Sequence, residues 1–569
     1  MSIREGDSVR DWFAAQSPGR RLWLFLAAVG AVLALLSLAG ARPPADALKV
    51  APSTVESSEA KPAVVAEAMG SVSERPGSSG KPVRTLTIPR GSEPADPAAK
   101  PPARADTAAA GSGRPTKAWR VAEGPAADAK RDETAAPQLT AKSLPALKTT
   151  ATKMNIQDVK SPGGISAWLV EEHSVPLLAL RFVFDGGSSQ DPAGKEGLAN
   201  FLSAMMDEGA GDMNATQFQE RMEELALRMS FEDGRDAFYG SFETLSVNRD
   251  PALDMLRLAL NKPRFEAEAT DRVRKQLLAN LAYAAKNPQS VAGRIWNEEA
   301  FRGHPYGHNS AGSPESVAAI QPADLEGYRK RIFARDTLRV VAVGDIDAKT
   351  LGEVLDKVFG ELPAKADLAP VAATSPHPAE KLKVVEMDVP QSVVVFGMNG
   401  LARKDPDFIP AFVMNQVLGG GGFASRLTEE VREKRGLAYS VYSLVQPYRH
   451  AATFSGGVAT KNEAVKESID VIRAELLRMA TDGPTDAELA NAKSYLTGSF
   501  ALRFDTNAKI ANQLLWMLQE DMGIDYVSRR NAMIDAVTMD DVKRAAKRVL
   551  KVDDLFITVV GKPKGLGKG

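Results

Sequence analysis

The segment 319–345 reads AIQPADLEGYRKRIFARDTLRVVAVGD, and it aligns without a gap on the segment 536–562, which reads AVTMDDVKRAAKRVLKVDDLFITVVGK. Gly344 pairs with Gly561, and this offset of 217 residues (561 − 344) holds along the whole alignment. Each copy combines a capped helical pattern with an apolar run that ends in Val-Gly. The repeat therefore predicts two related units, each with a helix that leads into a buried strand.

The shared ending divides the chain into two similar α+β halves, residues 153–364 and 380–567, joined by a Pro/Ala-rich linker at 365–379. A chain of 569 residues is too long for one hydrophobic core, which agrees with this division. A chance similarity between two helix–strand units is the alternative, and the gapless match disfavours it. We expect an α+β fold.

The composition excludes several kinds of protein. A formal net charge of −1 gives no support to nucleic-acid binding. The chain has no cysteine, so neither disulfides nor a thiolate metal site can stabilise it. A metal site would depend on His, Asp and Glu, and the sequence has only five His.

Residues 22–41 form an uncharged apolar run, LWLFLAAVGAVLALLSLAGA, which follows a polar N-terminus ending in two arginines. About 20 helical residues span the hydrocarbon core of a membrane, so the run predicts a transmembrane anchor with residues 1–21 in the cytoplasm. A cleaved signal peptide is the alternative, because Ala39 and Ala41 have the spacing of a cleavage site. Both interpretations export the rest of the chain, which we expect on the periplasmic side of the inner membrane.

Residues 42–150 are rich in Pro, Ala, Ser, Gly and charged side chains and contain almost no aromatic residue. Such a segment buries too little apolar surface to offset the entropy lost on ordering. We predict a disordered tether between the membrane and the folded halves.

Four successive glycines, Gly419, Gly420, Gly421 and Gly422, precede a predicted helix at about 425–434 and a strand that begins at Leu437. Glycine gives up side-chain packing for backbone freedom, which suits a mobile loop or one that another group approaches closely. The Ser425 hydroxyl is placed to cap the helix.

Arg432 lies near the end of this predicted helix and Tyr439 near the start of the strand, so a guanidinium and a phenol converge across one turn. The pattern alone is also explained by a helix-terminal cation and a half-buried strand residue. The nearby carboxylates are better explained as the solvated face of the helix than as acids or bases: Glu429, Glu430 and Glu433.

His304 and His308 are four residues apart. On a helix this spacing would present both rings to one metal ion, but Pro305 and Gly307 predict a loop. No third His lies close by in the sequence, so metal binding here is disfavoured.

Three motifs together resemble the pitrilysin/insulinase family of inverted-motif zinc peptidases: GGSSQDPAGKEGLANFLSAM at 186–205, HPYG at 304–307 and GGGFASRLTEEVREKRGLAYSV at 420–441. The resemblance covers about residues 153–567 and implies that the two α+β halves form one half of a peptidase-like clamshell. An active member carries HxxEH in the first motif, where two His bind zinc and the Glu activates water.

The resemblance places Asn200 and Ala204 at the two His positions, Ser203 at the base, and Asn280 at a third ligand that is Glu in the family. None of these side chains is a credible zinc ligand or general base. The resemblance therefore implies a chain that binds no metal and is inactive alone.

In the family, an Arg and a Tyr seven residues apart reach the substrate from the non-catalytic half, and Arg432 and Tyr439 match both identity and spacing. Both side chains can donate hydrogen bonds to peptide carbonyls and to a developing oxyanion. The glycines 419–422 are expected to adapt to an unfolded or extended peptide. Some members divide the two functions between subunits, so the resemblance implies a homologous HxxEH partner that supplies zinc.

Two other functions remain open at this point. A structural or assembly protein would keep the peptidase-like shell without supporting proteolysis, and Arg432 and Tyr439 would then be packing residues. A peptide-binding module that acts alone as a homodimer would bind peptides without a second subunit.

Overall fold

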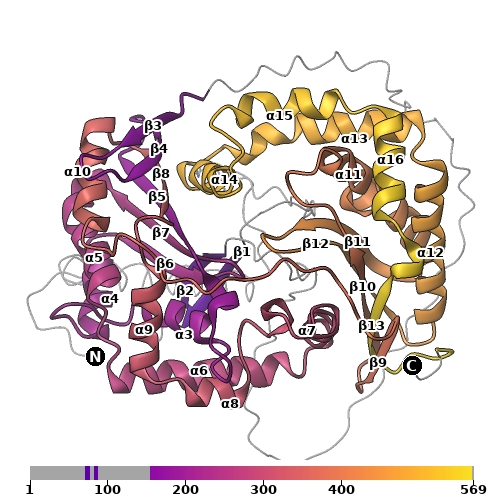
Figure 1. Ribbon diagram of the computed structural model, residues 1–569, viewed down its shortest axis with the longest axis horizontal. Coiled ribbons are helices and arrows are strands. Elements are labelled where there is room, and N and C mark those ends of the chain that lie inside the picture. The colour runs from indigo at the N-terminus through magenta and orange to yellow at the C-terminus, as the bar shows by residue number, and fades with distance from the viewer. Residues whose placement is uncertain (1–70, 77–81, 88–153, 567–569) are drawn as a thin grey trace, which may run out of the picture. The chain divides into compact units, whose positions relative to one another are not determined.

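The structure, a computed structural model, describes residues 71–76, 82–87 and 154–566 (Figure 1). The predicted anchor at 22–41 lies outside these residues; within them, no helix is long and apolar enough to cross a membrane. Most of the predicted tether also lies outside them. Its described part is a pair of antiparallel strands, β1 (Ser71–Pro76) and β2 (Pro82–Thr87), which the composition of this segment does not predict.

The first half is built on a six-stranded mixed sheet with the order β3-β4-β8-β5-β7-β6. Its strands are β3 (Gln157–Lys160), β4 (Ser166–Glu171), β5 (Leu177–Asp185), β6 (Arg228–Asp233), β7 (Ala237–Leu245) and β8 (Arg339–Gly344). Its helices are α3 (Leu198–Met205), α4 (Ala215–Glu224), α5 (Arg249–Asn261), α6 (Ala267–Ala284), α7 (Pro288–Ala300), α8 (Pro314–Ala319), α9 (Pro322–Ile332) and α10 (Ala348–Phe359).

The second half is built on a five-stranded mixed sheet with the order β11-β12-β10-β13-β9. Its strands are β9 (Leu382–Glu386), β10 (Gln391–Asn399), β11 (Ala438–Pro447), β12 (Ala452–Lys461) and β13 (Phe556–Gly561). Its helices are α11 (Phe408–Asn415), α12 (Val465–Asp482), α13 (Asp486–Gly498), α14 (Asn507–Gln519), α15 (Tyr526–Asp535) and α16 (Met539–Val549).

The predicted repeat is present in three dimensions. Helix α9 and strand β8 have the same lengths and spacing as α16 and β13, and each helix starts with a capping box. Strand β8 pairs in parallel with β4 and antiparallel with β5, and β13 pairs in the same way with β9 and β10. The two halves therefore share their topology as well as their sequence pattern.

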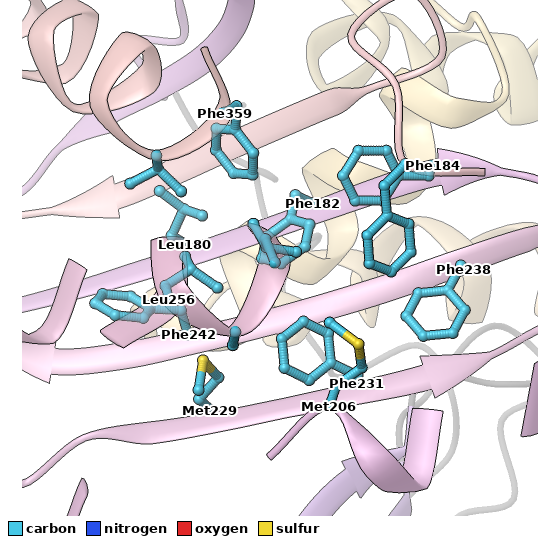
Figure 2. Packing of buried hydrophobic residues seen from close by; sticks show 14 of the residues in the cluster. Leu180, Phe182, Phe184, Met206, Met229, Phe231, Phe238, Phe242, Leu256 and Phe359 are labelled. Atoms are coloured by element: carbon cyan, nitrogen blue, oxygen red, sulfur yellow. The ribbon is translucent and has the colours of Figure 1, made fainter. Parts of the chain in front are cut away.

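Aromatic side chains fill the core of the first half (Figure 2). The Phe182 ring makes edge contacts with Phe184, Phe231 and Phe359, at centroid distances of 5.3 to 6.2 Å. Gly240 faces this ring from β7, and a Cβ there would lie 2.0 Å from it. Because Gly240 has no side chain, the Phe182 ring can pack directly against the backbone of β7.

Each half also packs a helix on the sheet of the other half. Helix α14 covers one face of the first sheet, where its apolar residues join those of β4, β5 and β8 in one cluster. Helix α7 covers the second sheet, and the Trp296 indole donates to the Phe556 carbonyl of β13 at 3.4 Å. The two sequence halves are therefore not independent folding units.

Candidate functional site

The candidate site lies at β11, an edge strand of the second sheet, and at the helical segment that precedes it. The predicted helix is present, but Thr428–Glu433 forms a π-helix. The amide of Thr428 donates to the Ser425 hydroxyl at 3.4 Å, in agreement with the predicted cap. π-Helical turns are rare and frequently occur at functional sites.

The Glu430 carboxylate is buried, which corrects the prediction that it lies on a solvated face. It accepts hydrogen bonds from Lys434 at 2.8 Å and Arg435 at 2.6 Å, and these bonds lower the pKa of Glu430. Its neighbours Glu429 and Glu433 are exposed, as predicted. These two ion pairs stabilise the end of the helical segment that carries Arg432.

Arg432 and Tyr439 converge, as the sequence predicted. The guanidinium carbon of Arg432 lies 4.8 Å from the centre of the Tyr439 ring, a cation–π contact. Tyr439 is 74% exposed, and among the described residues no hydrogen bond engages its hydroxyl. An exposed phenol held by an arginine, with its hydroxyl available, is unusual for a packing residue and suits contact with a ligand.

A β-bulge sets the direction of Tyr439. Ala438 pairs with Thr460 and Val441 with Val458, so two residues of β11 oppose the single residue Ala459 of β12. A bulge of this kind adds one residue and re-aims the side chains beside it. Ala438 packs against the apolar core of the second half, whereas Tyr439 is exposed beside Arg432.

Residues 419–422, the four successive glycines, do not all lie in a loop as predicted. Gly419 and Gly420 are buried within a π-helical extension of α11, Gln416–Gly420, which corrects their interpretation as a mobile substrate loop. A Cβ on Gly419 would lie 2.6 Å from the backbone nitrogen of Ser443, so the glycine permits close approach of β11. Gly421 and Gly422 are less buried and lead into the next turn.

The residues predicted to replace the zinc motif lie on α3 and α6. Asn200 is buried and its amide donates to the Asp233 carboxylate at 2.8 Å. The Ser203 hydroxyl donates to the Asn200 carbonyl at 2.9 Å, and Ala204 packs against the apolar core. Asn280 is exposed on α6.

These residues do not fit zinc. An amide, a hydroxyl and a methyl group replace the imidazole and carboxylate ligands that zinc requires, and the amide is engaged by a carboxylate of the same chain. Within the described ranges, no group of three His, Cys, Asp or Glu is placed to hold a metal ion. No chemical step can therefore be assigned to a metal held by this chain.

The comparisons with known proteins agree with this geometry. Residues 168–313 match the insulinase family of peptidases (M16), and residues 319–496 match the peptidase M16 inactive domain. The crystal structure of a peptidase M16 inactive domain from Pseudomonas fluorescens is 30% identical, with a TM-score of 0.68 over 72% of this chain and 98% of that one. This chain belongs to the M16 peptidase family.

Two curated relatives of this M16 chain differ in what their names state. The non-peptidase homolog YmxG of Helicobacter pylori is 28% identical over 69% of this chain and 91% of its own length. The mitochondrial-processing peptidase subunit beta of Lentinula edodes is 23% identical over 75% of this chain and 95% of its own length. The match to the inactive domain supports a catalytically incomplete member of the family.

The HPYG motif has a structural role in this M16 chain. The His304 Nδ1 accepts from the Tyr306 amide at 3.1 Å and its Nε2 contacts the Ala372 carbonyl at 2.9 Å, whereas His308 is exposed. The Tyr306 hydroxyl donates to Asp236 and accepts from the His450 amide. The motif therefore joins the first half to the turn that follows β11.

Sequence reasoning missed this connection between the halves. Arg449, in the turn between β11 and β12, forms an ion pair with Asp185 at the end of β5. The guanidinium of Arg235 lies over the rings of Tyr306 and Tyr448, at 4.7 and 4.8 Å. The only sequence signal was the HPYG motif itself, so the far end of β11 is fixed by contacts that no local pattern encodes.

Proposed function

We propose that this chain is the non-zinc subunit of a heterodimeric zinc metalloendopeptidase. It binds an extended peptide and stabilises the transition state with Arg432 and Tyr439, while a homologous HxxEH subunit supplies zinc. The proposal rests on one observation: in a chain whose predicted zinc positions do not fit a metal, the half-buried Arg432 stacks on the exposed Tyr439 of an edge strand.

The chemistry of the pair supports this role. Guanidinium and phenol groups donate hydrogen bonds, and such donors stabilise negative charge that develops on a carbonyl oxygen. The pair is also held in place before any ligand binds, because Arg432 stacks on the Tyr439 ring and the bulge fixes the strand. Donors that are already oriented need little reorganisation during the reaction.

The partner subunit provides what this chain lacks. Its zinc site activates the attacking water, and its edge strand binds the peptide main chain. This chain supplies the opposite wall of the chamber. We extend the proposal to location: the N-terminal segment exports the chain to the periplasmic side of the inner membrane, where both subunits meet the substrate.

The test is a pair of substitutions in the complex reconstituted with the HxxEH subunit. Arg432→Ala and Tyr439→Phe should each lower peptide turnover at least about tenfold, which is roughly 1.4 kcal/mol of transition-state stabilisation. Tyr495→Phe, at a partly exposed tyrosine of α13, is the matched control and should have no effect. Full turnover in both variants would instead support a structural or assembly role for the fold.

A further inference from the structure

Tyr439 lies in the bulge of β11 between two buried polar contacts. In the first contact, the Thr460 hydroxyl of β12 donates to the Leu437 carbonyl at 2.6 Å. In the second, the Ser443 hydroxyl donates to the Asn415 side-chain oxygen at 2.7 Å, and the Asn415 amide donates to the Ser443 carbonyl at 3.0 Å. We infer that Thr460 and Asn415 are positioning residues that hold Tyr439 for the substrate, an inference that rests on the proposed function.

The first contact fixes the turn that follows Arg432. The Gly436 amide donates to the Arg432 carbonyl at 2.8 Å, and the Leu437 amide donates to the Val431 carbonyl at 2.9 Å. Because the Thr460 hydroxyl binds the Leu437 carbonyl, both backbone polar groups of Leu437 are engaged. The turn between the π-helical segment and β11 is therefore attached to β12 as well as to the segment that carries the arginine.

Thr460 is held in turn by the core of the second half. It is 1% exposed and lies on β12, between β11 and β10. Its hydroxyl accepts from the buried Ser468 hydroxyl of α12 at 3.4 Å. Buried hydroxyl groups that have both a donor and an acceptor keep one orientation, because no water is available to replace either partner. The first contact thus ties the exposed turn to a rigid part of the fold.

The second contact gives a reason for two of the four glycines. Asn415, the last residue of α11, and Ser443 of β11 are 3% and 0% exposed. A Cβ on Gly420 would lie 2.8 Å from the Asn415 amide nitrogen, and a Cβ on Gly419 would collide with the Ser443 hydroxyl. Glycine at both positions therefore leaves room for the two hydrogen bonds that join α11 to β11.

Together the two contacts enclose the extra residue of the bulge, where two residues of β11 oppose one residue of β12. As an edge strand, β11 has only β12 to hold its register. A shift of one residue turns the side chains of a strand to the other face, and would take the buried Val441 out of the core. With Leu437 fixed before the bulge and Ser443 after it, the extra residue cannot move along the strand. Tyr439 consequently keeps one direction.

The first experiment observes the side chain at position 439 in the full chain by fluorine NMR. The probe is para-trifluoromethylphenylalanine, introduced at this position, whose signal reports the surroundings of the ring. The chain with both contacts intact should give one signal. Thr460→Val keeps the shape of the side chain and removes the donor, and Asn415→Ala removes the second contact. Each of these variants should give a second, separate signal.

Thr558→Val is the matched control. Thr558 is a buried threonine of β13 in the same sheet, and among the described residues its hydroxyl has no hydrogen-bond partner. This variant should keep one signal, and Thr460→Ser, which restores the donor, should do the same. If either main variant fails to fold, Ser443→Ala removes one bond of the second contact and should also give two signals. A single unshifted signal in the folded variants that lack a contact would overturn the inference.

The second experiment measures peptide turnover in the complex reconstituted with the HxxEH subunit. Thr460→Val should lower kcat about fivefold and change KM less than about twofold. In a Tyr439→Phe background the same substitution should change kcat by less than about twofold, because its effect acts through the Tyr439 hydroxyl. Equal losses in both backgrounds would overturn the inference. Unchanged turnover in Tyr439→Phe alone would refute the proposed role of the pair, whereas the NMR signals decide separately whether Thr460 and Asn415 hold the ring.

Discussion

Replacing Asn200 by alanine tests whether the predicted remnant of the zinc motif now has a purely structural role. The Asn200 amide donates to the Asp233 carboxylate at 2.8 Å, and both side chains are buried. A hydrogen bond to a charged group contributes roughly 1.5 to 3 kcal/mol, and water cannot readily replace the donor at a buried site. Asn200→Ala should therefore lower the free energy of unfolding by about 2 kcal/mol, which for a chain of this size is about 2 °C in the thermal midpoint.

Calorimetry and peptide turnover should be measured on the same preparations of the complex. Turnover at saturating peptide should stay within about twofold of wild type, because Asn200 has no chemical role in the proposal. Asn280→Ala is the matched control, since this exposed asparagine is at the predicted position of the third ligand and should change neither quantity. A tenfold loss of turnover at an unchanged midpoint in Asn200→Ala would refute the reasoning.

Three further predictions concern the support of the site. Gly419→Ala should destabilise the chain by about 1 to 3 kcal/mol, because the new methyl group meets the Ser443 backbone nitrogen at 2.6 Å; an unchanged midpoint would contradict the packing. The hydrogen bonds from Arg426 lower the pKa of Glu488 to about 2. They therefore stabilise the folded state fully above the ordinary glutamate pKa of about 4.5. This stabilisation is lost as the pH falls from about 4.5 toward 2. Glu488→Gln should flatten acid unfolding in that interval, and a curve parallel to wild type would argue against it. Asn512→Ala removes an acceptor from a fully buried arginine of β5 and should speed proteolysis within α14, whereas an unchanged digestion pattern would show that this contact does not hold α14.

The repeat was predictable because its signals are local. A capping residue, a helical apolar pattern and a Val-Gly ending occupy 27 consecutive residues, and they specify α9 with β8 and α16 with β13 in the same way. The exchange of α7 and α14 between the sheets was not predictable. Their sequences specify amphipathic helices, but which sheet each one covers depends on contacts with strands far away in the sequence.

The sequence indicated which residues form the candidate site, but only part of their arrangement. The spacing of Arg432 and Tyr439 brought them together across one turn, as observed. The bulge that directs Tyr439 depends on pairing with β12 and leaves no mark in the local sequence. The partner of Asn200 was missed for the same reason, because Asp233 reaches it only through the fold of β6 against α3.

The most direct test of the central claim is to purify the native protein with whatever binds it, and to measure zinc and peptidase activity before and after the subunits are separated. We expect a second, HxxEH-bearing subunit, about one zinc per heterodimer, and peptide cleavage only by the complex. The separated chain should contain no stoichiometric zinc and should cleave nothing. Close to one equivalent of zinc on the separated chain, with cleavage of peptides, would contradict it.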